Sequence, residues 1–296
     1  MSTDVDWQSL CARAGLAAHH LIGWIMWDPA AIARYADLGV PDGRGWIIAW
    51  RLATLGDVSP AVAASTTYSM DPRIIEFVVN AYRGVASTDD ILEVRNASVL
   101  DGLNDIAPGL AEELAPLAPA LWHGVDSVHF GVRPLFNAHR SRPADRQTEP
   151  AVSAWLAVHC LRELRGDNHW ALCAAADLDD VEVGLLHSVM VDPNEYGSDE
   201  WIARSRGADD ERDANGWRRR EAKGWAADGQ LTDAGRSFRL ELEERTDALT
   251  VPAWQAAGAA ATTALCEAVE AHQDAFLARV DETAGPRWMP AIRGPR

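Results

Sequence analysis

The chain has 296 residues, 48% of them hydrophobic, and a formal net charge of −17 at pH 7. This length fits one large domain or two ordinary ones, and the hydrophobic content is ample for a buried core. No apolar run approaches the roughly 18 residues of a membrane-spanning helix, and the first residues lack a secretory signal pattern. The four cysteines are scattered without a C-x-x-C pair, which suits reduced thiols better than disulfides or a zinc site. We therefore expect a cytoplasmic globular protein that does not enter a membrane.

Helix start signals recur through the first half of the chain. Apolar residues at helical spacing predict helices over residues 7–25 and 46–55. Ser87 with Asp90 three residues later matches a capping box, which begins another helix. A capping side chain followed by a first-turn proline begins a helix at three further places: Asp28-Pro29, Ser59-Pro60 and Asp71-Pro72.

The middle of the chain has mixed signals. Residues 107–120 are rich in proline and alanine, which favours a short helix or a broken connector. Alternating apolar residues predict a strand over residues 126–135. Residues 140–150 are polar, with two prolines and three arginines, and we interpret them as the linker between two halves.

The second half predicts further helices and one ribbon. Gly166 is expected to end a helix in the left-handed conformation, so that Asp167 caps the next one. A charged loop is expected over residues 193–213, and the tail from residue 285 is expected to be loosely ordered. The remaining expected elements are helices at 151–165, 167–176, 179–190, 214–225, 234–249 and 254–280, and a short ribbon within 227–235.

This order of helices, with Gln230–Gly235 between a basic helix and a long one, resembles a MarR-type winged helix. Three stretches resemble an actinobacterial helix-turn-helix family of tandem MarR-like proteins: Arg51–Gly56, Phe130–Leu135 and Leu161–His169. The resemblance implies a mainly α fold with two winged-helix halves, short β-wings and a long C-terminal helix. It places the halves at residues 1–140 and 151–250, followed by a helix and tail at 251–296. It implies no established activity.

The stretch around Gly166 gathers the residues best suited to bind a ligand. Arg162 and Arg165 are three residues apart and share a helix face. Asp167 can pair with an arginine, and His169 titrates near neutrality, so it can act as an acid, a base or a hydrogen-bond donor. Together they could hold an anionic or carbonyl-bearing small molecule. The alternative is a corner held by charge-assisted hydrogen bonds, without a ligand.

Two isolated arginines are secondary candidates. Arg51 and Arg133 each stand in an apolar run, where a charge needs a partner. Each would either form a buried structural ion pair or line a cavity between the halves. The histidine spacings indicate no metal site, and the chain lacks a P-loop, a dinucleotide-binding glycine motif and a G-x-S-x-G motif. We therefore expect no cofactor and assign no catalytic residue.

A basic cluster matches the position of a MarR-type recognition helix, which would contact DNA through Arg218, Arg219, Arg220 and Lys223. Residues 201–223 carry seven basic and five acidic side chains, a net of only +2. A protein of net charge −17 repels phosphate backbones unless its positive charge is concentrated, which disfavours nucleic acid as a partner.

Three functions therefore remain open. The first is binding of a small aromatic or anionic metabolite, with its chemical conversion as a further option. The second is a MarR-type DNA-binding regulator, and the third is a non-catalytic interaction scaffold. The sequence leaves the oligomeric state undetermined.

Overall fold

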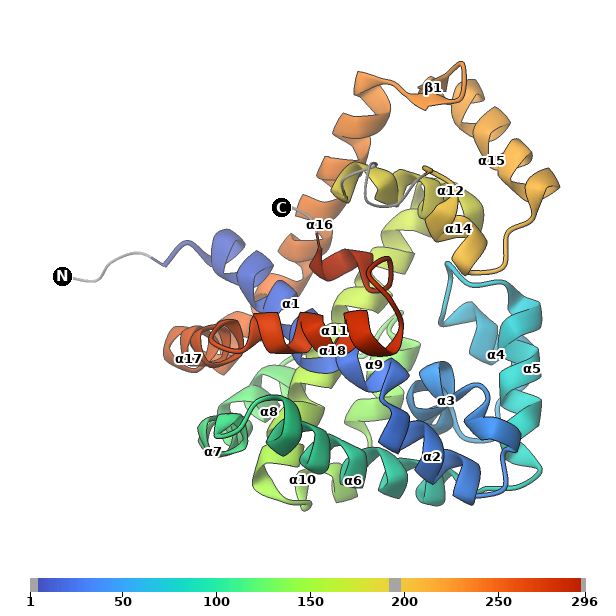
Figure 1. Cartoon of the computed structure of the whole chain (residues 1–296). Helices are drawn as coiled ribbons and strands as arrows, with labels where there is room; N and C mark the ends of the chain where they lie inside the picture. The colour runs from blue at the N-terminus through green and yellow to red at the C-terminus, as the bar shows by residue number, and fades with distance from the viewer. Residues whose placement is uncertain (1–4, 192–197, 294–296) are drawn as a thin grey trace.

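The computed structural model describes residues 5–191 and 198–293, and these are mainly helical, as predicted. Most helices form one body, and a smaller lobe lies at the top of Figure 1. The lobe contains α12 (Asp180–Leu186), α14 (Trp201–Ser205), α15 (Asp210–Ala222) and the ribbon of β1 (Ala226–Ala227) and β2 (Gln230–Leu231). Two long helices, α11 (Pro150–Ala175) and α16 (Asp233–Ala257), run from the body into the lobe. None of the helices described is long and apolar enough to cross a membrane.

The predicted capping residues of the first half begin helices. Asp28 accepts a hydrogen bond from the Ala31 amide at the start of α2 (Pro29–Asp37). The same device begins α4 (Pro60–Ser65) and α5 (Pro72–Arg83), and a capping box begins α6 (Thr88–Ile106). The other helices here are α1 (Trp7–Gly23), α3 (Trp46–Leu52), α7 (Leu110–Leu114), α8 (Ala118–Asp126), α9 (Pro134–Arg140) and α10 (Pro143–Arg146).

The predicted helix break at Gly166 is wrong, because this glycine lies inside α11, which is a single helix of 26 residues. Most of α11 is buried against both the body and the lobe, and this packing outweighs the cost of about 1 kcal/mol of a glycine inside a helix. Asp167 does accept a hydrogen bond from a helix N-terminus, but that helix is α9: its carboxylate accepts from the Phe136 amide at 2.9 Å.

Two further expectations for the middle of the chain are wrong. Residues 126–135 form no strand, because α8 ends at Asp126 and α9 begins at Pro134. The side chains of Phe130 and Val132 are 66% and 81% exposed in the connecting loop, so their alternation reflects no buried face. Residues 140–150 are not an open linker, since they contain α10 and a buried Asp145. That carboxylate pairs with the buried Arg95 at 3.2 Å.

In the second half, the basic helix, the ribbon and the long helix after it follow the predicted order, with changed boundaries, but α14 is a helix inside the loop expected over residues 193–213. The basic helix α15 begins at Asp210, because Asp209 caps it through the Arg212 amide. Residues 193–197 of the expected charged loop lie outside the described residues. The single C-terminal helix expected over 254–280 is wrong. Gly258, at φ +91°, ends α16, and α17 (Ala259–Glu270) and α18 (Gln273–Thr283) follow.

The main hydrophobic core combines residues from most of the chain. It includes α1, α3, the first half of α11, the end of α16 and the C-terminal helices, together with the fully buried Trp24, Trp50 and Trp155. A smaller core around Cys173, Leu186 and Leu242 holds the lobe to α11 and α16. Both cores include residues of α11 and α16. The body and the lobe therefore face each other beside these two long helices.

Candidate functional site

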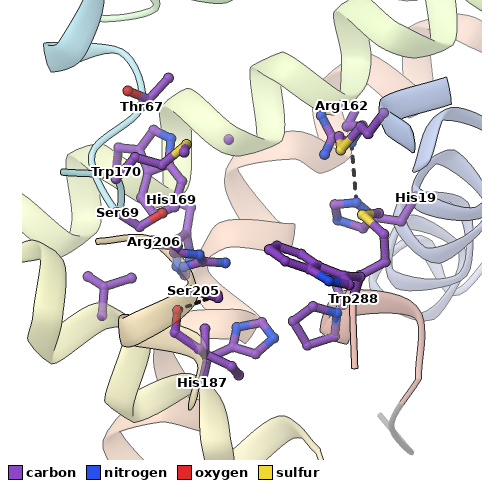
Figure 2. Close-up of a pocket in the computed structure, with 18 of the residues that line it drawn as sticks. His19, Thr67, Ser69, Arg162, His169, Trp170, His187, Ser205, Arg206 and Trp288 are labelled. Carbon is purple, nitrogen blue, oxygen red and sulfur yellow. Dashed lines mark hydrogen bonds between the residues drawn. The ribbon is translucent and has the colours of Figure 1, made fainter. Parts of the chain in front are cut away.

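A cavity of about 270 Å³ lies between the body and the lobe, beside α11 and α16. The body contributes α1, α3 and η1 (Trp24–Trp27), and the lobe contributes α12, α14 and η5 (His187–Met190). The C-terminal segment around η6 (Pro290–Ile292) forms part of the wall. Figure 2 shows side chains from these separate segments pointing toward one another across the cavity.

The cavity lining is strongly cationic. It contains five arginines, Arg51, Arg162, Arg165, Arg206 and Arg239, and only two acidic residues, Glu163 and Glu243. Five positive charges therefore face two negative ones, in a protein whose overall charge is −17. This concentration of positive charge around one partly open cavity is the main electrostatic feature of the site.

Glu163 pairs with two of these arginines. Arg51, from α3, donates to its two carboxylate oxygens at 3.0 and 2.7 Å, and Arg162 donates at 2.8 Å. Burial alone would raise the pKa of Glu163, but the two guanidiniums hold it below the usual value. Burial also lowers the pKa of Arg162 to about 10, which leaves this guanidinium charged at neutral pH. Arg162 further donates to Nδ1 of His19 on α1 at 3.3 Å.

A second charge network joins α11 to α16. Arg165 donates to Asp247 at 3.0 Å and also contacts Glu243. Arg239 pairs with the same Glu243 at 2.7 Å, one helical turn away. Both arginine side chains are largely buried. The two Arg165 ion pairs hold α16 against α11 at the edge of the cavity, and the Arg239–Glu243 pair lies within α16.

Arg206 differs from the other four arginines. It follows α14, and among the described residues no carboxylate forms an ion pair with it and no side-chain hydrogen bond satisfies its guanidinium. Burial lowers its pKa to about 10, and no nearby acid opposes that effect. In Figure 2, Arg206 lies between His169 and His187. Arg206 is half-buried, whereas Nε2 of His187 is buried without a hydrogen-bond partner in the described part of the chain.

Other parts of the cavity lining are apolar and aromatic. Trp288 packs against Trp27 of the body, with ring centroids 5.3 Å apart, and against Trp201 of the lobe at 5.4 Å. Trp170, from α11, lines the cavity as well and stacks on Tyr68. The tail was expected to be loosely ordered from residue 285, and this is wrong for residues 288–292, because they close one wall and bury Met289 and Ile292.

Four of the six residues expected from the sequence to bind a ligand line the cavity: Arg51, Arg162, Arg165 and His169. Asp167 and Arg133 do not. Asp167 is buried against the start of α9, and burial raises its pKa to about 7. Arg133 donates to Asn168 of α11 at 3.0 Å and to two carbonyls of its own loop. These two residues fix α9 against α11.

Three of the four residues expected to contact DNA are engaged within the lobe. Arg220 is fully buried and donates to the carbonyl oxygen of Glu182. Arg219 and Lys223 both pair with the Glu182 carboxylate, at 2.8 and 2.9 Å. Arg218 is exposed and has one long hydrogen bond to Asn215.

Sequence reasoning missed several cavity residues: Glu163, His187, Arg206, Arg239, Glu243 and Trp288. Glu163 directly follows Arg162 and precedes Arg165 by two residues. A carboxylate this close to two candidate arginines was the signal that could have identified it. Arg206 and Arg239 belong to elements that are distant in sequence from α11, and only the packing of the lobe brings them to the cavity.

The order of short helices, ribbon and long helix is consistent with a helix-turn-helix fold. A family model agrees with this: the chain belongs to the helix-turn-helix family, whose model matches residues 12–283. Comparisons with curated proteins and with solved structures found no match.

Proposed function

We propose that the cavity binds a small molecule that carries an anionic group and an apolar body. The observation that carries this proposal is Arg206, a guanidinium on the cavity wall without an acidic partner among the described residues. Arg206 is half-buried. A charge that is partly withdrawn from water is stabilised by a partner of opposite charge, and a bound anion would supply that partner. The cavity lining has more arginines than acidic residues, and this excess of positive charge also favours an anionic ligand.

The apolar half of the proposal follows from the rest of the lining. Trp170, Trp201 and Trp288 contribute flat apolar surfaces, with methionines such as Met26 and Met190 beside them. Ligand pockets commonly combine such walls with a few charged groups that orient the ligand. The volume of about 270 Å³ is slightly below the usual range of about 300–1,000 Å³, which favours a metabolite of one or two rings.

Native mass spectrometry of protein purified from its own host tests the proposal. We expect a retained mass that dissociates on denaturation and that is lost in the Arg206→Ala variant. The matched control is Arg218→Ala, which removes an exposed arginine from the same lobe and should retain the ligand. A protein that carries no small molecule, and whose melting temperature no anionic aromatic compound raises, would favour the interaction scaffold.

A DNA-binding regulator is the second candidate, because the chain belongs to the helix-turn-helix family. The finer hypothesis is a tandem MarR-like protein with winged-helix halves at residues 1–140 and 151–250. The order α12, α14, α15, ribbon, α16 supports it for the second half. The internal ion pairs of Arg219 and Lys223 argue against a free DNA-contacting face on α15. Superposition of the two halves through at least three helices tests the tandem arrangement.

A further inference from the structure

Hydrogen bonds fix the tautomer of His169. The hydroxyl of Thr246 lies 2.7 Å from the carbonyl oxygen of Leu242, and it must donate there because a carbonyl only accepts. Nδ1 of His169 lies 3.0 Å from the same hydroxyl oxygen, whose proton is already used. Nδ1 therefore carries the hydrogen and donates it to Thr246. In a neutral imidazole this leaves Nε2 as a lone-pair acceptor.

The surroundings keep this imidazole neutral. Burial first, and then the positive charges of Arg239 and Arg165, lower the pKa of His169 to about 3. Thr246 is itself fully buried in α16, so the hydrogen-bonded chain from Leu242 to His169 is built into the helix packing. One ring carbon separates Nε2 from Nδ1, so the Nε2 lone pair points away from Thr246, and His169 lines the cavity.

The wall around Arg206 thus combines two unlike groups. Arg206 offers only hydrogen-bond donors and a positive charge, whereas His169 offers an acceptor. Figure 2 draws both side chains in the same part of the cavity, and the charge of Arg206 contributes to the lowered pKa of His169. A ligand that satisfied Arg206 with an anionic group and left His169 beside an apolar group would bury an unpaired acceptor, which is unfavourable.

We propose that the site selects small acids that also carry a hydroxyl group, with the anion on Arg206 and the hydroxyl donating to Nε2 of His169. This inference rests on the proposed function and narrows its ligand class to hydroxylated acids with an apolar body. His169 is then the residue that sets specificity, and Thr246 is a positioning residue that fixes the acceptor.

Isothermal titration calorimetry with phenylacetate and its three ring-hydroxylated isomers tests this selection. We expect phenylacetate to bind, and at least one isomer to bind about tenfold more tightly, which is the usual upper effect of one neutral hydrogen bond. His169→Phe should abolish the preference, measured within that variant as the ratio of the dissociation constants of phenylacetate and of its tightest-binding hydroxylated isomer. Thr246→Val should reduce the preference, because it removes the hydroxyl that fixes the tautomer.

The outcomes separate this inference from the function on which it rests. Binding of phenylacetate that depends on Arg206, but without preference for any hydroxylated isomer, would overturn the hydroxyl selection alone. A preference that survives in His169→Phe would do the same. If none of the four acids binds, the proposed function fails together with this inference, because phenylacetate already has an anionic group and an apolar body. Arg218→Ala is the control that should bind like the parent.

Discussion

Arg51 and Glu163 form a two-point ion pair, with Nε to Oε1 at 3.0 Å and Nη2 to Oε2 at 2.7 Å. The pair joins α3 to α11 at the cavity wall, although the two residues are 112 positions apart in the sequence. Glu163 is 2% exposed and also pairs with Arg162, so one buried carboxylate pairs with two guanidiniums and the group of three keeps a net charge of +1. The stability of the body and the charge of the cavity therefore depend on the same residue.

Glu163→Gln should strongly destabilise the protein. The amide leaves Arg51 and Arg162 without their carboxylate, and loss of one partner of a buried ion pair costs roughly 3–5 kcal/mol. Urea unfolding followed by circular dichroism measures the free-energy difference. Glu93→Gln, on the exposed face of α6, is the control and should change stability by less than about 0.5 kcal/mol. A loss below about 1 kcal/mol in Glu163→Gln would contradict the structural role of this pair.

Arg165 and His169 should respond differently to substitution. Arg165→Ala removes a guanidinium that pairs with both Glu243 and Asp247, so we expect a loss of roughly 3–5 kcal/mol. His169→Gln should cost no more than about 1–2 kcal/mol, because it removes a single hydrogen bond to Thr246. Thermal melts of both variants, converted with the unfolding enthalpy, test this order. Equal losses would mean that His169 is as structural as Arg165.

Helix caps were predicted correctly, because the interaction that forms a cap involves only residues close together in the sequence. A cap such as Ser87 and the amide that it binds, that of Asp90, lie three residues apart, so the sequence specifies the interaction. The break at Gly166 was also a local inference, and it failed because the surroundings of α11 bury the helix on both sides of the glycine. The alternation of Phe130 and Val132 failed in the same way, since only tertiary contacts decide which face is buried.

Only some of the cavity residues could be predicted, because most contacts in the cavity depend on tertiary packing. A charged residue in an apolar run, such as Arg51, needs a partner, and that requirement can be recognised without a structure. Its partner, Glu163, could not be assigned, because an ion pair over 112 residues depends on how α3 packs on α11. Arg206 gave no comparable signal, since its neighbours in the sequence are polar. Its position on the cavity wall results from the docking of α14 against the body.

Asp167→Asn should change how stability depends on pH. Burial raises the pKa of Asp167 to about 7 in the folded protein, above its ordinary value of 3.8, so the folded state holds the extra proton. The contribution of this group to stability is therefore fully present below about pH 4 and is lost as pH rises through 7. An asparagine can still accept from the Phe136 amide. We expect the variant to be more stable than the parent at pH 8, by on the order of 2 kcal/mol.

Urea unfolding of parent and Asp167→Asn at pH 5 and pH 8 measures this effect as a difference of differences. The other titrating groups are common to both proteins and cancel. The advantage of the variant should shrink at pH 5, where the parent carboxyl is protonated. A variant that is less stable than the parent at pH 8 would show that the charged carboxylate stabilises the start of α9.

Random duplex DNA should bind weakly. The overall charge of −17 repels the phosphate backbone, and Arg219, Arg220 and Lys223 are held within the lobe. In a mobility-shift titration at about 0.15 M salt we expect no complex below about 10 µM protein, the middle of the usual non-specific range. A complex at lower concentration that weakens in Arg218→Ala would make the DNA-binding function the leading one.

The effect of Gly166→Ala on stability distinguishes a continuous α11 from two helices that end and begin at Gly166, because the two arrangements predict changes of opposite sign. Within a helix, alanine is favoured over glycine by about 0.5–1 kcal/mol, and a methyl group at this position would lie 3.8 Å from Trp170 and 3.9 Å from Glu163, which is ordinary contact. A glycine that ended a helix in the left-handed conformation would instead lose about 1–2 kcal/mol on substitution. We expect the melting temperature to rise. Because Gly166 also lines the cavity, the added methyl should weaken phenylacetate binding, so stability and affinity should change in opposite directions.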